Sequence, residues 1–482
     1  MTQQINSYGI SKLISTVVSN DLCIGCGMCA AICPIRALTM DWGANGLYQP
    51  EPAPAASCGD CTECLRVCPF TSGLVPGIDI PNEDALAEAS ATAPSSTHDP
   101  YLGHYLALRA GYATELREIG SSGGLATWTL SRLLERGDID AAFCVAPVTE
   151  SRNAHFDFVV CKSAEEVRRA ARTRYYPAKL DRVIEYVLNN EGRYALVALP
   201  CSIKALRLAQ RARPVLRERI VFVVGTFCGG LKTRYYTEYL AAAAGCERDQ
   251  IHSPEFRIKN PDSAADDYAF GCQDGKGTTH TIRMRALGDM WGTGLFKPNP
   301  CDYCDDLAAE LADISVADAW IPPYRADGRG TSIVVVRSNA AASLLERGAA
   351  DGTLSLEPVS AAQVNASQQG NINHRRKGLA YRLLIARRRG YKVPLKRVGP
   401  ARPVNPIFAI IQRLRMRVRQ LSHEAWMAQR EYPGTEIYDR IMKKDLSRLQ
   451  SITRFSHKLG NLVHRLKNHL ILQPWTLLTR RW

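Results

Sequence analysis

Continuous apolar runs alternating with amphipathic segments dominate the chain between residues 101 and 370. "DIDAAFCVAP", "RYALVALP" and "ERIVFVVGTF" are strand-length runs with little polar alternation, which is typical of strands buried on both faces. "GGLATWTLSRLLERG", "SIKALRLAQRA" and "TRYYTEYLAAAA" have the 3.6-residue period of helices. This pattern predicts a mixed α/β core, with more irregular β segments near residues 252–285.

The last part of the chain is amphipathic and strongly basic. "NPIFAIIQRLRMRVRQL" predicts a helix with Asn405 as its N-cap and Pro406 at its first position, and a second apolar stripe follows "PGT". Residues 371–482 contain 26 Lys/Arg against 5 Asp/Glu, whereas residues 1–370 contain 35 against 42. We expect a basic helical hairpin that docks on the body or on a second copy, with its arginines in water. An anionic membrane surface is the alternative partner, and nucleic acid is the weakest because no aromatic-interleaved motif accompanies the charge.

Two cysteine runs occupy the first 75 residues. "CIGCGMCAAICP" and "CGDCTECLRVCP" each place three cysteines at two-residue gaps and a fourth before proline, which is the ligand run of a bacterial-type ferredoxin. The fourth cysteine of each run serves the other cluster, so the motif must occur twice. Zinc is the alternative, because paired CxxC spacings also bind zinc. The prediction is two 4Fe–4S clusters, one held by Cys23, Cys26, Cys29 and Cys68, the other by Cys58, Cys61, Cys64 and Cys33.

The composition suggests four regions. We expect a two-cluster ferredoxin-like domain over 1–75, a polar linker over 76–100, an α/β core over 101–370 and a basic helical tail over 371–482. The first twenty residues lack a basic start followed by an apolar core, and the longest apolar runs are of strand length. Together with 16 cysteines, this favours a protein of a reducing compartment, cytoplasmic or peripheral to the membrane.

Four more cysteines follow strand ends or lie in a loop of the expected core. Cys201 follows "VALP", Cys228 follows "VVGTF", and "CDYC" supplies Cys301 and Cys304. Because α/β sheets place their sites at strand C-termini, these four thiols could hold a cubane or a zinc ion. Cysteine also packs well in cores, and this explanation fits the remaining cysteines better, namely Cys144, Cys161, Cys246 and Cys272.

A serine–glycine loop precedes the first core helix. In "IGSSGGLAT" two serines and two glycines stand before a helix N-terminus, where backbone N–H groups and hydroxyls can bind a phosphate. The loop alone is more often a simple helix cap.

Several of these motifs resemble a known family. "LREIGSSGGLATWTLSRLLERGDIDAA", "ALPCSIKALR", "VVGTFCGG" and "CDYC…ADISVADAW" are similar to successive motifs of the coenzyme F-420 (8-hydroxy-5-deazaflavin) hydrogenase/dehydrogenase beta-subunit family, over about residues 20–340. "GLYQP" resembles its ferredoxin-fused members. The resemblance implies a flavoprotein that binds FAD, with a 4Fe–4S cluster beside the flavin. It further implies core-cluster ligands at Cys201, Cys228, Cys301 and Cys304, and FAD contacts at Ser121, Ser122, Gly123, Gly124 and Thr127.

The chain departs from the family pattern at four places. Ser202 replaces the usual Gln, Gly229 the usual His and Ala317 the usual Gly, while "RYY" at 174–176 replaces Ser-Lys-Tyr. These positions belong to the region where flavin and substrate would meet. Arg174 and Lys179 remain as cations that could face a phosphate or an anionic flavin.

These features predict an iron–sulfur flavoprotein oxidoreductase that passes electrons from the ferredoxin-type clusters, through a core cluster, to FAD and on to a small organic acceptor. The expected partners are a redox protein and that acceptor. The alternatives are a non-catalytic electron-transfer subunit and, as the poorest fit, a zinc-bearing interaction protein. The motifs single out no catalytic residue.

Overall fold

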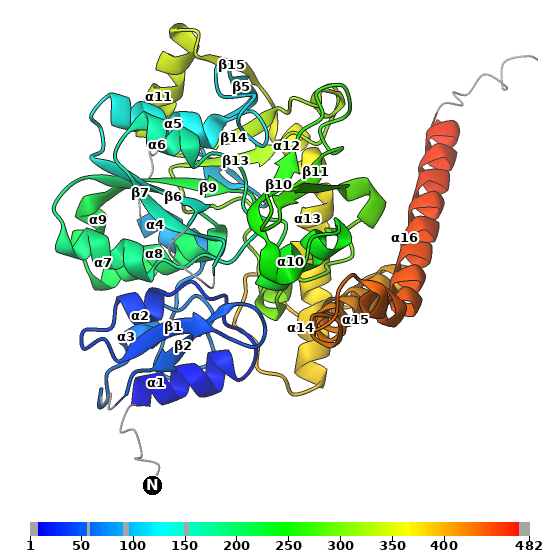
Figure 1. Cartoon of the computed structure of the whole chain (residues 1–482), viewed down its shortest axis with the longest axis horizontal. Helices are drawn as coiled ribbons and strands as arrows, with labels where there is room; N and C mark the ends of the chain where they lie inside the picture. The colour runs from blue at the N-terminus through cyan, green and yellow to red at the C-terminus, as the bar shows by residue number, and fades with distance from the viewer. Residues whose placement is uncertain (1–7, 55–57, 90–95, 149–153, 472–482) are drawn as a thin grey trace, which may run out of the picture.

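A mixed eight-stranded sheet forms the centre of the molecule (Figure 1). The computed structural model describes residues 8–54, 58–89, 96–148 and 154–471. The strand order is β15-β5-β14-β13-β9-β8-β6-β7, and the four strands from β13 to β6 run parallel. The strands are β5 (Ala107–Ala113), β6 (Ala141–Pro147), β7 (Phe156–Cys161), β8 (Tyr194–Ala198), β9 (Ile220–Thr226), β13 (Ile314–Asp318), β14 (Ser332–Val336) and β15 (Leu354–Pro358).

Helices cover both faces of this sheet. Alternate residues of β6 belong to different apolar clusters: Cys144 packs with residues of α5, α6 and α11, whereas Phe143 packs with residues of α7, α8 and α9. This double burial explains the continuous apolar runs and confirms the α/β prediction. The helices are α5 (Leu125–Glu135), α6 (Ala164–Arg169), α7 (Asp181–Asn189), α8 (Pro200–Ala212), α9 (Val215–Arg219) and α11 (Asn339–Ala350).

The N-terminal domain has ferredoxin-like elements and packs directly on the core. It contains α1 (Tyr8–Leu13), η1 (Ile14–Val18), α2 (Met28–Ala31), β1 (Leu38–Trp42), β2 (Tyr48–Pro52) and α3 (Glu63–Arg66). Helix α2 contacts α7 and α8, and α3 contacts α8. The Leu180 N–H donates to the Cys26 carbonyl at 2.8 Å, and the Tyr235 hydroxyl donates to the Ala44 carbonyl at 2.7 Å. Since residues of both domains share one apolar cluster, the domain is docked rather than loosely tethered.

The expected linker over 76–100 is partly structured. It contains α4 (Glu83–Ala89) and β3 (Thr97–Asp99), which pairs with β4 (Gly103–Tyr105). The Glu83 carboxylate is buried and lies 3.0 Å from the Lys204 ammonium of α8. This ion pair attaches α4 to the core; residues 90–95 lie outside the described chain.

A second, smaller layer of the core lies beside the main sheet (Figure 1). It consists of α10 (Arg234–Ala243) and an antiparallel sheet of β10 (His252–Ile258), β11 (Ala269–Gln273) and β12 (Thr279–Arg283). The β10–β11 pairing contains register shifts, so the expectation of irregular β structure near 252–285 is confirmed. Short helices complete the core: η2 (Arg248–Gln250), η3 (Met284–Leu287), η4 (Asn299–Tyr303), η5 (Tyr324–Ala326), α12 (Ala361–Ser367), α13 (Gln369–Asn373) and η6 (His374–Gly378).

The basic tail forms the predicted helices. After α14 (Leu379–Arg388) come α15 (Pro406–Gln429) and α16 (Glu436–Ile471), which pack on each other. The Asn405 side chain accepts hydrogen bonds from the first helical N–H groups, as its N-cap position predicted. The described part of the chain contains no helix long and apolar enough to cross a membrane.

Helix α15 docks on the core, but the expectation that its arginines stand in water is wrong for at least one of them. The Arg419 guanidinium is buried and lies 2.8 Å from the Asp302 carboxylate. The Ser422 hydroxyl accepts a hydrogen bond from the Phe296 N–H at 2.9 Å. The basic residues of α15 therefore belong partly to the internal charge balance of the core.

Replacing Trp426 tests this docking. Its ring is 2% exposed, and its indole N–H donates to the Glu238 carboxylate at 2.9 Å. Trp426→Ala should lower the free energy of unfolding by about 3–5 kcal/mol, because it opens a cavity and removes that hydrogen bond. Urea denaturation measures the change. Met427→Ala, at the exposed next position, should have a small effect; equal effects of the two variants would mean that α15 is not anchored here.

Candidate functional site

The structure brings the first predicted ferredoxin set of thiols together. Cys23, Cys26, Cys29 and Cys68 line one cavity, whose other walls are apolar residues of η1, α2 and β1 and the Pro69–Phe70 pair. Burial raises the pKa of the Cys29 thiol, and the neighbouring Cys26 and Cys23 raise it further. The Gly25 N–H donates to the Cys23 sulfur at 3.4 Å. Gly25 has a φ of +72°, which permits the tight loop.

The second set also gathers as the spacing predicts. Burial, together with the neighbouring thiols of Cys58, Cys61 and Cys33, raises the pKa of the Cys64 thiol to about 12. The Ala37 N–H donates to the Cys33 sulfur at 3.3 Å. Cys33 thus lies with the thiols of the other run, as crossed ligation requires.

The four core thiols come from three places in the fold. Cys201 lies in the first turn of α8, just after β8; Cys228 follows β9; Cys301 and Cys304 lie in and just after η4. Burial raises the pKa of the Cys201 thiol, and Cys304, Cys228 and Cys301 raise it further. The Leu231 N–H donates to the Cys301 sulfur at 3.3 Å. The arrangement therefore collects the four thiols that the sequence suggested.

The first ferredoxin set is the one that faces the core thiols. Cys26 is among the neighbours that raise the pKa of Cys201, after burial and the three core thiols. Pro69 and Phe70, which follow Cys68, line a second cavity together with Cys201 and Cys304. Two of the three thiol groups are therefore neighbours across the domain contact.

The donor chemistry of the core group fits an anionic cluster. Arg375 is 2% exposed, its Nη2 donates to the Cys228 carbonyl, and its Nε donates to the Asp306 carbonyl at 3.1 Å. Its Nη1 is buried and has no hydrogen-bond partner among the described residues. Burial alone would lower the pKa of Arg375, but the thiols of Cys304, Cys228 and Cys301 raise it above its ordinary value. A fully buried guanidinium with an unpaired nitrogen suits a cluster that carries net negative charge when bound by four thiolates.

No group of three or more His, Cys, Asp or Glu side chains in the described ranges is arranged to hold a single metal ion. A 4Fe–4S cubane is larger than one ion, and its four cysteine ligands stand correspondingly farther apart around it.

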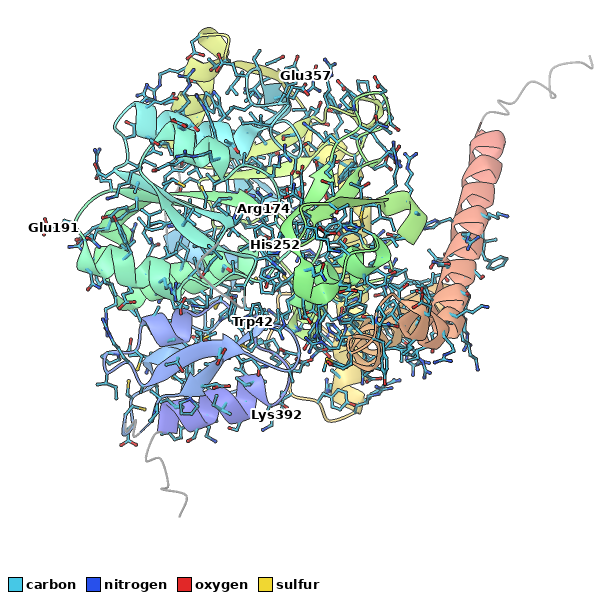
Figure 2. The ribbon with its side chains drawn as sticks, in the orientation of Figure 1. Trp42, Arg174, Glu191, His252, Glu357 and Lys392 are labelled. Atoms are coloured by element: carbon cyan, nitrogen blue, oxygen red, sulfur yellow. The ribbon has the colours of Figure 1, made fainter. Side chains whose placement is uncertain are left out.

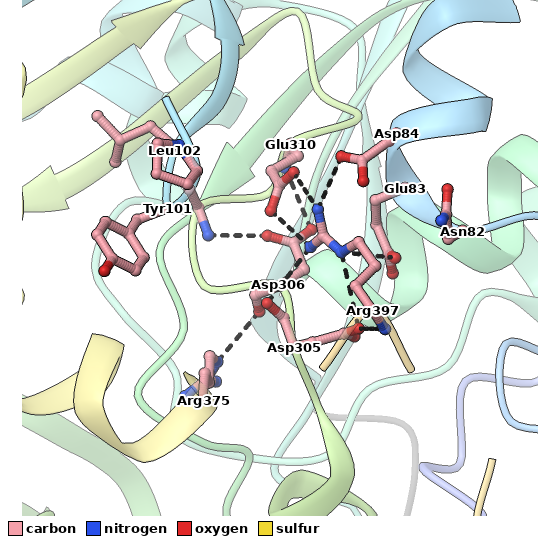
Figure 3. A network of polar contacts seen from close by, with 12 residues as sticks. Asn82, Glu83, Asp84, Tyr101, Leu102, Asp305, Asp306, Glu310, Arg375 and Arg397 are labelled. Carbon is pink, nitrogen blue, oxygen red and sulfur yellow. Dashed lines mark hydrogen bonds and ion pairs between the residues drawn. The ribbon is translucent and has the colours of Figure 1, made fainter. Parts of the chain in front are cut away.

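A buried ion network holds the segment after Cys304 (Figure 3). The Arg397 guanidinium lies 2.8 Å from the Glu310 carboxylate and 3.0 Å from that of Asp84, and its backbone N–H donates to Asp305 at 3.1 Å. Burial, together with the carboxylates of Glu310 and Glu83, raises the pKa of Asp306 to about 7. The network ties the loop to α4 and to the chain before α15. In the sequence, Lys396 and Arg397 are an isolated basic pair, and no motif predicts that they form buried ion pairs.

A second ion cluster holds the loop at Cys301. The Asp302 carboxylate lies 2.8 Å from the Lys297 ammonium and 2.8 Å from the Arg419 guanidinium. Burial would raise the pKa of Asp302, but Lys297, Arg419 and Arg382 together hold it well below its ordinary value. Helix α15 therefore supports one of the thiol-bearing loops.

The serine–glycine loop is closed largely by the protein itself. The Ser121 hydroxyl accepts from the Thr173 N–H at 2.8 Å, and the Ser122 hydroxyl donates to the Thr331 carbonyl at 3.0 Å. The Gly123 N–H donates to the Ser332 hydroxyl at 3.1 Å. Thr127 follows, half-buried, in the first turn of α5.

Gly124, at the N-cap of α5, has a φ of +76°, and a Cβ there would lie 2.7 Å from the Leu116 carbonyl oxygen. The sequence suggested that a phosphate could approach the backbone here, but the position next to the Gly124 Cα is occupied by the Leu116 backbone. The glycine is therefore required by the fold whether or not the loop binds a ligand.

Cations surround this loop. The Arg172 Nε donates to the Ile119 carbonyl at 3.3 Å, and Arg172 has a φ of +91°, a strained conformation of the kind found at ligand sites. Burial lowers the pKa of Arg174 to about 10, helped by Arg172, and its buried Nε has no partner among the described residues. Burial, together with neighbouring arginines, lowers the pKa of Lys259 to about 8, although Glu118 opposes the shift. Figure 2 labels Arg174, which is partly buried, near the middle of the view, where the main sheet and the smaller layer adjoin. Arg172 is paired with the Glu255 carboxylate, and an anion would offset the remaining positive charge of Arg174 and Lys259.

Lys179 lies elsewhere, at the contact between the two domains. Its ammonium pairs with the Asp181 carboxylate at 2.7 Å and stands 5.5 Å from the Tyr48 ring centroid. Its Cβ lies close to Gly27, between two cysteines of the first run. The interactions of Lys179 are thus with α7 and the ferredoxin-like domain.

An aromatic wall stands next to Cys228. The Tyr175 ring meets the Trp291 ring edge-on with centroids 4.7 Å apart, and a Cβ at Gly229 would lie 3.5 Å from Trp291. Phe256 contacts Tyr175 at 5.6 Å between ring centroids. Two of the four departures from the family pattern therefore meet at one place, where the sequence offered no reason to single out Trp291 or Phe256.

The cysteines left out of the sites are buried in the core. Cys144 and Cys161 belong to the cluster under α5, and Cys246 and Cys272 to the cluster around α10. Their packing agrees with the structural role expected of them.

Family models match most of the described core and the N-terminal domain. Residues 22–72 match "4Fe-4S dicluster domain". Residues 108–185 match the N-terminal model, and residues 191–362 the C-terminal model, of the "Coenzyme F420 hydrogenase/dehydrogenase, beta subunit".

Curated relatives agree with these matches. The chain is 25% identical to the F component of the F(420)H(2) dehydrogenase of Methanosarcina mazei, over 64% of this chain and 79% of the relative. It is 24% identical to a coenzyme F420-dependent sulfite reductase of Methanocaldococcus jannaschii over 67% of this chain, but only 45% of that protein. It is 22% identical to the beta component of the coenzyme F420 hydrogenase of Methanothermobacter thermautotrophicus, covering 60% of this chain and 96% of the relative.

Replacing one fourth cysteine tests the crossed sets. Cys33→Ser should remove the cluster that involves Cys58, Cys61 and Cys64 and leave the one built on its own run, because Cys33 lies with the second set. Iron analysis and EPR of the reduced protein give the readout. Cys68→Ser is the matched variant and should damage the other cluster. Loss of the first-run cluster in Cys33→Ser would show that each run binds its own cubane.

Arg375 can be tested against its neighbour in sequence. Arg375→Gln removes a buried positive charge beside three thiols, so the reduction potential of the core cluster should fall, because the reduced state carries one more negative charge. An EPR-monitored redox titration measures the shift. Arg375→Lys should restore part of it. Arg376→Gln, whose guanidinium is exposed and bonds to the Pro100 carbonyl, should leave the potential unchanged; an equal shift in both variants would contradict the assignment.

Proposed function

The chain belongs to the coenzyme F420 hydrogenase/dehydrogenase beta-subunit family and has an N-terminal 4Fe–4S dicluster domain, and from that premise we propose that it is an iron–sulfur flavoprotein oxidoreductase. It passes electrons from the two ferredoxin-type clusters, by way of a core cluster, to FAD and on to a small organic acceptor. The observation that carries the proposal is the convergence of twelve cysteines into three four-thiol groups, two of them adjacent across the domain contact.

The clusters would supply one-electron redox steps, and the protein contributes burial, charge and position. The walls of the cavity around Cys29 and Cys68 are mostly apolar and leave these cysteines only partly exposed. Arg375 supplies positive charge beside the core group, and Leu231 directs an N–H at the Cys301 sulfur. The Leu180–Cys26 hydrogen bond attaches the loop of the first ferredoxin group to the core domain.

FAD is proposed to bind beside the loop of Ser121, Ser122, Gly123, Gly124 and Thr127, with its diphosphate toward Arg174. The support is electrostatic: Arg174 and Lys259 are partly buried with lowered pKa values, and Arg172 is strained beside them. A diphosphate would compensate the charge that these residues share. Lys179, held by Asp181 at the domain contact, is better placed to orient the ferredoxin-like domain than to bind the flavin.

The acceptor is proposed to approach the aromatic wall of Tyr175 and Trp291, next to Cys228. Flat rings favour a flat, conjugated acceptor through stacking. The relatives carry coenzyme F420 in their names, which supports a deazaflavin acceptor. The changes at Gly229 and Tyr175 favour another small organic substrate instead. No catalytic residue is assigned.

The proposal includes a redox partner protein and a reducing, cytoplasmic location. Two of the relatives are named as components of larger enzymes, which supports work with a partner and also favours the alternative of an electron-transfer protein that feeds a separate reductase. In the alternative the clusters are present and flavin is absent.

Cofactor content separates these possibilities. Reconstituted protein should contain about twelve irons, four for each of three cubanes, and one FAD. Brown protein without flavin would favour the electron-transfer alternative, and colourless protein that holds zinc would overturn the proposal.

A charge variant tests the flavin site. Lys259→Gln together with Arg174→Gln should lower the FAD content several-fold and leave the iron content unchanged, since the hydrogen bonds of both side chains are to backbone carbonyls outside the thiol groups. Arg136→Gln with Arg132→Gln, on surface ion pairs of the same domain, is the control. Stoichiometric FAD in the Lys259→Gln, Arg174→Gln variant would contradict the proposal that the flavin binds beside this loop.

A further inference from the structure

Helix α16 uses only its first part to pack on the body. Its buried apolar residues, Tyr438, Met442 and Leu449, lie on one face and pack into the apolar cluster shared with α15 and α10, and the partly buried Ile452 packs against the same cluster. Beyond Ile452 the helix continues to Ile471, about 28 Å at 1.5 Å per residue. Figure 1 shows this distal part extending away from the rest of the molecule.

A second apolar stripe on α16 faces solvent. Ile441 is 36% exposed, Phe455 is 59% exposed and Leu459 is 40% exposed. At 100° per residue these three positions share one side of the helix, and that side differs from the one that packs on α15. In the sequence the same spacing continues at positions 462, 466 and 470, all leucine.

The charged residues around the distal part of this stripe are all basic. After Asp445 the chain contains seven Lys/Arg and no Asp/Glu up to residue 482. Arg454 and Lys458 are exposed on the distal helix, and Arg448 lies among the apolar positions of the stripe. The sequence of this region also contains Trp475 and Trp482, a residue type enriched at membrane interfaces.

We propose that the distal part of α16 binds the surface of an anionic lipid bilayer, with Phe455 and Leu459 inserted at the level of the headgroups and the flanking cations against lipid phosphates. An amphipathic helix with an exposed apolar stripe and a basic flank has the composition of an interfacial helix. Each Lys or Arg near such a surface strengthens the attraction, and the apolar side chains add their transfer from water.

A second copy of the chain is a weaker partner for the same face. Two copies related by a twofold axis would bring the same cations together, and the acid-free stretch offers no opposite charge to pair with them. A bilayer provides dense negative charge and an apolar layer in one surface. The lipid surface therefore satisfies both features of the helix.

The test is co-sedimentation of the full-length, cluster-loaded protein with vesicles of phosphatidylcholine alone or mixed with phosphatidylglycerol. The protein should bind the mixed vesicles, and binding should weaken as salt rises. Phe455→Ser with Leu459→Ser should lower the partition coefficient about tenfold or more, because it removes the apolar contribution of both side chains. Arg454→Glu with Lys458→Glu should lower it by at least a similar factor.

The matched control reverses two exposed charges that lie outside α16. The Lys162→Glu, Arg169→Glu variant should bind vesicles as the wild type does. All variants should keep their iron content and circular dichroism, because the changed side chains are exposed. Three outcomes would overturn the proposal: no binding to mixed vesicles, equal loss of binding in the control, or a lipid-free dimer in light scattering that the Phe455/Leu459 variant dissociates. The last would assign the stripe to a second copy.

Discussion

The burial of opposite charges around the segment from Cys301 to Glu310 is the constraint on which the rest of the structure depends. This segment places two thiols beside Asp302, Asp305 and Asp306 inside the protein, where an unpaired carboxylate would cost several kcal/mol. Partners must therefore arrive from elsewhere in the chain. Lys297 and, from α15, Arg419 pair with Asp302, and Lys396 and Arg397, which lie before α15, pair with Asp305 and Glu310.

The same requirement joins the domains. Arg397 pairs with Asp84 and Glu310, so α4, which connects the ferredoxin-like domain to the core, is attached to the thiol-bearing loop by charge. Lys204 pairs with Glu83 from the first turns of the helix that also carries Cys201. Because the network is shared, a displacement of the N-terminal domain would expose carboxylates and weaken the loop that holds Cys304. The electron-input domain and the core thiols are in this sense one structural unit.

The tail divides into two parts with different physical roles. Helix α15 contributes Arg419 and Trp426 to the interior and is part of the core's stability. The distal half of α16 contributes nothing to the interior through Phe455 or Leu459, which remain exposed. Both helices are basic, but the charge of α15 partly neutralises buried carboxylates, whereas the charge of the distal half of α16 faces solvent. Net charge alone could not distinguish these two uses.

The sequence by itself determined the local structure. Cysteine spacing predicted which thiols gather, because three ligands two residues apart must lie in one turn of backbone and the fourth must reach the neighbouring cluster. Apolar runs predicted the buried strands, and Asn405 with Pro406 predicted a helix start, because both depend on backbone periodicity and caps.

Only the tertiary structure decided how distant segments meet. It placed Arg375 beside thiols some 70 to 150 residues earlier in the chain, put Lys179 at the domain contact rather than beside the serine–glycine loop, and filled the space at Gly124 with the Leu116 carbonyl. It also turned Arg419 inward, where the helical pattern had put it in water. These outcomes depend on long-range packing and on the free-energy cost of burying unpaired charge. Neither produces a periodic pattern that can be recognised in the sequence.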